Sequence, residues 1–96
     1  MNTLTDFENM TRAEICYTHL VTSCLLFKNE LVQVIYNDEG VTCKCKSKKT
    51  ERVFEQVYYF TSIYEKNDLI ELIQNDTSLC ENTEFEFLTR KRRNYN

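Results

Sequence analysis

The stretch LVQVIYNDEGVTCKCK, residues 31–46, decides the fold because it has the pattern of two strands around a tight turn. Residues 31–36 are rich in β-branched and aromatic side chains, which favour strands. The polar tetrapeptide 37–40 ends in Gly40, the only glycine of the chain and the residue type that most freely accepts a positive φ. In residues 41–46 apolar and polar side chains alternate, as they do in a strand with one buried face. The pattern predicts an antiparallel hairpin.

The segment before the hairpin carries the start of a helix. Residues 11–14 fit the capping box, in which Thr11 and Glu14 exchange hydrogen bonds between side chain and backbone. Apolar residues then recur at steps of three and four, which is the spacing of one helical face. We therefore expect a helix over 11–28, with Asn29 as its C-terminal stop. A second capping-box pattern at residues 5–8 predicts a short preceding turn.

Three further elements follow the hairpin. Residues 52–61 are crowded with strand-forming side chains, so we expect a strand, although the apolar spacing over 53–64 also fits a helix. Residues 68–74 form a short amphipathic pattern behind a cap at Asp68, and residues 84–89 predict a last strand. The order α-β-β-β-α-β predicts a small single α+β domain over residues 1–89, with helices packed on one face of an antiparallel sheet. A basic tail, 90–96, follows it.

Composition narrows the setting of the protein. The chain of 96 residues has no apolar run near the ~20 residues of a membrane span and no secretory start, so we expect a cytoplasmic location. An odd number of cysteines, five, then predicts reduced thiols. Residues with AT-rich codons greatly outnumber those with GC-rich codons, and proline and tryptophan are absent. This skew favours an AT-rich genome and the hypothesis of a viral or phage accessory protein.

The residue types that catalytic sites commonly need are scarce in this sequence. One histidine and one glycine leave no basis for a glycine-rich phosphate loop or a well-supported cysteine–histidine pair, so we expect neither an enzyme nor a cofactor. A small zinc-binding domain is an alternative, because one helical turn and one strand face could present a set of thiols and an imidazole: Cys16, His19, Cys43 and Cys45. The competing interpretation is that these thiols are core residues.

Nucleic-acid binding is a second alternative. The chain has a net charge of −3 but contains two basic blocks, which could contact phosphate groups. They are the segment Lys44–Arg52, which includes Lys44 and Lys46, and the tail residues Arg90, Lys91, Arg92 and Arg93. The order helix, three strands, helix resembles the double-stranded-RNA-binding domain in outline. The second helix, 68–74, departs from that family because it begins with acids and has no lysine cluster, and the glycine-proline loop of the family is absent.

The leading hypothesis is binding to another protein. Six tyrosines and six phenylalanines exceed what a small core comfortably buries, and aromatic side chains are typical of interface centres. The predicted binding surface has aromatic anchors and a basic rim; these are Tyr58, Tyr59 and Tyr64, with Lys48, Lys49 and Arg52. We therefore expect a small accessory protein, acting as a host-directed inhibitor or modulator if the origin is viral. Self-association into a homo-oligomer, such as a homodimer, is left open.

Overall fold

The computed structural model describes residues 9–88 and confirms the predicted element order. Two helices and four strands form one α+β domain: α2 (Arg12–Leu26), β1 (Asn29–Tyr36), β2 (Gly40–Ser47), β3 (Val53–Tyr59), α3 (Ile63–Asn75) and β4 (Glu84–Phe87). The turn predicted at residues 5–8 and the basic tail lie outside the described residues. No helix within residues 9–88 combines the length and apolar character needed to cross a membrane.

The start of α2 follows the capping-box prediction. The Thr11 hydroxyl accepts a hydrogen bond from the Glu14 amide at 3.1 Å, and the Glu14 carboxylate accepts one from the Thr11 amide at 2.9 Å. The predicted end was wrong, because the helix stops at Leu26 and Asn29 already opens β1. The chain leaves the helix through Lys28, whose φ of 56° lies in the left-handed region.

Strands β1 and β2 form the predicted antiparallel hairpin, with Tyr36 opposite Val41 and Leu31 opposite Cys45. An irregularity between Leu31 and Gln33 shifts the register by one residue. This bulge lets Leu31 and Val34 both reach the buried face, although they are three residues apart.

Gly40 is required for a reason that differs from the sequence prediction. Its φ is not positive, and the Asn37 side chain instead closes the turn by accepting hydrogen bonds from the Glu39 and Gly40 amides. A Cβ at Gly40 would lie 2.0 Å from the carbonyl oxygen of Tyr58 on β3. The position therefore needs glycine because two strand backbones approach closely there.

The segment that was ambiguous in sequence divides into two elements. The strand prediction for 52–61 is confirmed by β3, and α3 begins at Ile63 rather than at the predicted cap Asp68. Ser62 is the true cap, and its hydroxyl accepts the Glu65 amide at 3.3 Å. The earlier start places Lys66 inside the structure, where its Nζ donates to the Asn37 and Asp38 carbonyls at 2.7 and 3.1 Å.

The sheet has the order β3-β2-β1-β4 and is mixed, not wholly antiparallel as the sequence suggested. Strands β1, β2 and β3 alternate in direction, whereas β4 runs parallel to β1. The reason is the crossover through α3. This helix carries the chain back along the sheet, so β4 must run in the direction of β3, which is also that of β1.

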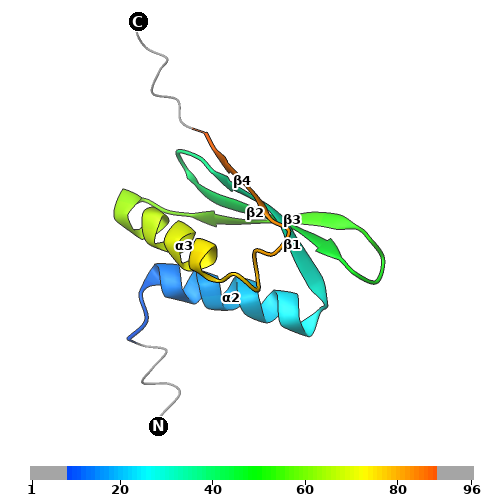
Figure 1. The fold of residues 1–96 in the computed structure, drawn as a ribbon. Helices are drawn as coiled ribbons and strands as arrows, with labels where there is room; N and C mark the ends of the chain where they lie inside the picture. The colour runs from blue at the N-terminus through cyan, green and yellow to red at the C-terminus, as the bar shows by residue number, and fades with distance from the viewer. Residues whose placement is uncertain (1–8, 89–96) are drawn as a thin grey trace, which may run out of the picture.

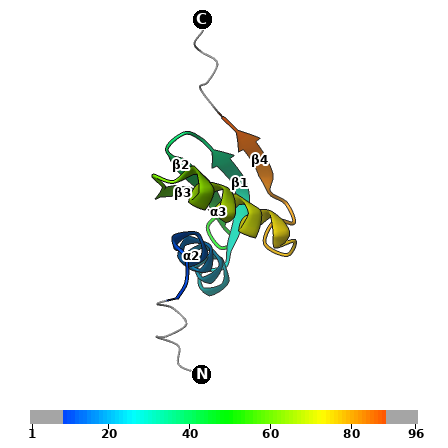
Figure 2. The same cartoon turned by 90° about the vertical axis from the view of Figure 1, so that its left-hand side faces the viewer.

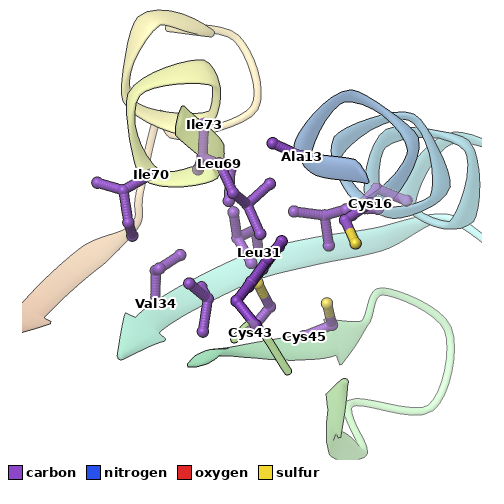
Figure 3. Close-up of a cluster of buried hydrophobic side chains, with 13 residues drawn as sticks. Ala13, Cys16, Leu31, Val34, Cys43, Cys45, Leu69, Ile70 and Ile73 are labelled. Atoms are coloured by element: carbon purple, nitrogen blue, oxygen red, sulfur yellow. The ribbon is translucent and has the colours of Figure 1, made fainter. Parts of the chain in front are cut away.

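Both helices lie on one face of the sheet, as predicted (Figures 1 and 2). The core forms between the two layers, where side chains of α2 and α3 meet the inward residues of β1 and β2 (Figure 3). Fully buried members include Leu20, Leu31, Leu69 and Ile73. In the part of the chain that the structure describes, nothing covers the opposite face of the sheet (Figure 2).

We expect Gly40→Ala to destabilise the fold by about 2–3 kcal/mol, because the new methyl group would collide with the Tyr58 carbonyl and force β2 and β3 apart. Chemical denaturation followed by circular dichroism measures the change. Glu39→Ala, at the exposed neighbouring position, is the control and should stay within about 0.5 kcal/mol of the parent. Equal stability of Gly40→Ala and the parent would contradict the close approach.

Candidate functional site

Strand β3 is an edge strand, since it pairs only with β2 among the described residues. Backbone hydrogen bonds join residue 60 to residue 39 at one end of the β2–β3 ladder and residue 47 to residue 52 at the other end. Bonded and non-bonded pairs alternate in an antiparallel ladder, so even-numbered residues 52–60 bond to β2. The N–H and C=O groups of residues 53, 55, 57 and 59 therefore point away from the sheet.

Within residues 9–88, the outward backbone groups of β3 are hydrogen-bonded to another element at one end of the strand only. The Arg12 guanidinium donates a hydrogen bond to the Tyr59 carbonyl at 2.7 Å and lies over the Phe60 ring at 5.2 Å. No such cap is present in residues 9–88 for the backbone of Val53, Glu55 and Val57. These three consecutive outward positions can accept an added strand.

The side chains of the same outward residues lie on the uncovered face of the sheet. Val53 and Tyr59 are 59% and 61% exposed, and Val57 is 40% exposed. The only charge among them, Glu55, lies 3.9 Å from the Lys44 ammonium of β2. Natural edge strands are usually protected by proline, inward charges or bulges. Strand β3 carries three exposed hydrophobic residues and one acid in this row, which we call the β3 edge: Val53, Glu55, Val57 and Tyr59.

The other face of β3 is held by α2. The side-chain amide of Gln56 makes two hydrogen bonds. Its Nε2 donates to the Ser23 hydroxyl at 3.2 Å, and its Oε1 accepts from the Tyr58 hydroxyl at 2.7 Å. The His19 Nδ1 is 2.9 Å from the same Tyr58 hydroxyl. Increasing residue numbers in α2 thus match decreasing numbers in β3, and the two elements run antiparallel.

The structure separates the predicted aromatic anchors from the predicted basic rim. Tyr58 is half-buried against the core, and burial is the main cause that raises the pKa of its phenol, so it is not a free anchor. Tyr59 and Tyr64 are exposed, at 61% and 78%. The basic residues lie elsewhere: Lys48, Lys49 and Arg52 are exposed at the opposite end of β3, roughly 20 Å from Tyr59 at the rise of a strand. The predicted anchors and rim do not form one patch.

The first basic block of the nucleic-acid alternative lies along the end of β2 and the loop that follows it. Lys44 and Lys46 lie half-buried on the uncovered sheet face, with Lys44 beside Glu55. Helix α3 contributes only Lys66, whose ammonium is enclosed by carbonyl groups and the Tyr36 ring. The tail residues, 90–93, lie outside the described part. The nucleic-acid alternative stays a prediction.

The four residues of the zinc-binding alternative do not come together as a set of metal ligands. Cys16, Cys43 and Cys45 are buried core residues, whereas His19 is exposed on α2 and contacts Tyr58. Within the described range, no three histidine, cysteine or acidic side chains are placed to hold a metal ion. All five cysteines are free thiols in the structure.

A groove that the sequence did not predict lies between the end of α2, the start of β1 and the loop after α3. It has a volume of about 480 Å³ and is lined by both apolar and polar or charged residues: Val21, Cys24, Leu25, Asn29, Glu30, Leu31, Lys48, Asp76, Ser78, Leu79, Glu81 and Asn82. Its walls come from four separate segments, so no sequence pattern could indicate it.

Asp76 supports one wall of this groove. It accepts a 2.5 Å hydrogen bond from the Tyr17 hydroxyl of α2 and a 3.1 Å bond from the Leu79 amide. The bond from Tyr17 to this carboxylate is the main cause that raises the pKa of Tyr17 to about 12. Asp76 therefore joins α2, the end of α3 and the following loop.

We expect the Tyr17–Asp76 bond to be lost at high pH. Because the folded pKa lies above the unfolded value of about 10, its contribution is complete below pH 10 and disappears as the pH rises toward 12. Melting temperatures of Tyr17→Phe should therefore fall less between pH 9 and 12 than those of the parent. Tyr64→Phe, at an exposed position, is the control. Parallel pH profiles for Tyr17→Phe and the parent would contradict this role.

Comparisons of the chain with family models, curated proteins and solved structures give no match.

Proposed function

We propose that this protein binds another protein by strand addition at the β3 edge. The observation that carries the proposal is the set of three consecutive uncapped backbone positions, 53, 55 and 57, on an exposed strand. An extended segment placed there would satisfy backbone groups that otherwise bond only to water. The activity that we propose is binding rather than catalysis.

The side chains indicate the chemistry of the partner segment. Alternate residues of an added strand would lie beside Val53, Val57 and Tyr59 on the uncovered sheet face, where apolar side chains are favoured. Arg52 and Lys49 are exposed just before the first residue of β3. A partner residue that lies beside them there would best be acidic. We therefore propose an extended partner segment with alternating apolar residues and an acid at one end. Because the residues with AT-rich codons favour a viral or phage origin, we propose that this binding inhibits a protein of the host.

We expect Val57→Pro to reduce partner binding at least about tenfold, since it removes an outward N–H group and obstructs an added strand. The fold should tolerate it, because residue 57 does not bond to β2. Val57→Thr is the matched control, since it keeps the N–H group and a β-branched side chain of similar size.

The measurement uses short peptides selected by display against the immobilised full chain, with affinities then determined by calorimetry. The amides of Val53, Glu55 and Val57 should become protected from hydrogen exchange when a selected peptide binds. Equal affinity of Val57→Pro and Val57→Thr, or protection confined to other elements, would overturn the proposal. A dimer of the chain alone that Val57→Pro converts to monomer would assign the edge to a second copy and also overturn it.

A further inference from the structure

One end of the domain exposes three large apolar side chains in succession. They are Leu25, Leu26 and Phe27, where α2 ends, and they are 73%, 69% and 65% exposed. Single exposed apolar residues are common on protein surfaces, whereas a contiguous apolar group is typical of an interaction site. We call these three residues the apolar tip.

A basic loop lies beside the apolar tip. The Lys48 amide donates a 3.0 Å hydrogen bond to the Lys28 carbonyl, and this bond joins the end of α2 to the loop between β2 and β3. Lys48 also lines the groove together with Leu25. Figure 1 shows both segments at one end of the molecule, away from the start of α3. Cations and large apolar side chains therefore share one surface.

The charge of this surface is opposite in sign to that of the whole chain. Residues 27–28 and 48–52 have a net charge of +3, whereas the whole chain has −3. The negative end of the α2 dipole corresponds to about half a charge, so it offsets only a small part. The charged residues of the two segments are four exposed cations and one exposed acid: Lys28, Lys48, Lys49, Arg52 and Glu51.

Further acids lie on another flank of this end. Glu30 of β1 and two residues of the loop after α3, Asp76 and Glu81, line the groove. Glu30 accepts a hydrogen bond from Asn82, and Asp76 accepts one from Tyr17. That loop leads into β4, which lies on the opposite side of β1 from β2 and β3. An anionic surface would therefore contact the side that carries the β2–β3 loop.

The geometry of the apolar tip favours a fluid surface over a rigid one. Successive residues of a helix project about 100° apart, so three in succession spread over about 200° around the axis. A rigid protein partner would need a socket around the end of the helix to cover all three. The interfacial region of a bilayer instead deforms around inserted side chains, and lysines beside them keep their ammonium groups among the lipid headgroups.

We propose that the apolar tip and the adjoining basic loop bind the surface of a membrane that contains anionic lipids. Leu25, Leu26 and Phe27 would enter the boundary between the headgroups and the acyl chains. Lys28 and Lys48 would approach the anionic headgroups around them. The site does not use the outward backbone groups of the β3 edge and does not depend on the function proposed there.

The first test mixes the full chain with vesicles and measures the bound fraction by sedimentation. Vesicles of phosphatidylcholine that contain phosphatidylserine should bind the chain at least about tenfold more tightly than vesicles of phosphatidylcholine alone. Added salt should weaken the binding, because it screens the attraction between the cations and the headgroups. No binding to the anionic vesicles, or equal binding to both kinds, would overturn the proposal.

A tryptophan reporter tests which part of the chain enters the bilayer. The chain has no tryptophan, so Leu26→Trp introduces a single one. Its emission should shift to shorter wavelength when the anionic vesicles are added. Tyr64→Trp, at a position that is 78% exposed near the start of α3, is the control and should show no shift. A shift for Tyr64→Trp but not for Leu26→Trp would contradict the proposed orientation.

Two double variants separate the apolar and the basic contributions. Leu26→Ser with Phe27→Ser should lower the affinity for anionic vesicles at least about tenfold, because less apolar surface is buried. Lys28→Asn with Lys48→Gln should lower it about as much, since each cation near an anionic surface contributes about fivefold. Asparagine suits residue 28 because it tolerates the φ of 56° there.

Lys44→Gln is the matched control for the loss of charge, because Lys44 lies beside Glu55 on the sheet and outside the proposed surface. It should change the affinity less than about twofold. Unchanged affinity of either double variant, with its fold verified by circular dichroism, would overturn the proposal.

The same variants keep this proposal distinct from the one for the β3 edge. Leu26→Ser with Phe27→Ser should bind a peptide selected for the β3 edge as tightly as the parent does, so either proposal can fail without the other. A dimer of the chain alone that this double variant converts to monomer would assign the apolar tip to a second copy and overturn membrane binding.

Discussion

The close approach of the β3 backbone to Gly40 is the constraint on which the rest of the structure depends. It sets the register in which Val41 faces Tyr58 and Cys43 faces Gln56. That register decides which β3 residues bond to β2 and which point outward. It also places the carbonyl of Tyr59 within reach of Arg12 on α2, which caps one end of the edge. A different register would turn another set of backbone groups toward solvent.

The helices then determine which surfaces are available. Because α2 and α3 both pack on one side, the sheet has one face in the core and one uncovered face within residues 9–88 (Figure 2). The polar contacts of Ser23 and His19 with β3 fix α2 along this strand. The same packing places Cys24, near the end of α2, and Cys45 of β2 in one buried core. The proposed binding edge thus depends on the arrangement of α2 on the sheet.

Several features of the fold were predictable because they depend on neighbours in the sequence. The capping box at Thr11 and the hairpin around Asn37–Gly40 are local, and both form where the pattern indicated. The start of α3 was missed although Ser62 and Glu65 have the spacing of a capping box, because the strand-forming residues around them favoured a strand instead. The parallel placement of β4 was missed because strand direction depends on how α3 crosses the sheet, which no local pattern records.

The sequence by itself determined the element types, the α+β class and the pool of candidate side chains, since propensity and periodicity act over a few residues. Only the tertiary structure decided which candidates are usable. Tyr58 and Tyr59 are neighbours with opposite roles, because successive strand residues point to opposite faces and α2 covers only one. The groove likewise joins segments far apart in the chain. Such contacts follow from packing, which composition and spacing do not specify.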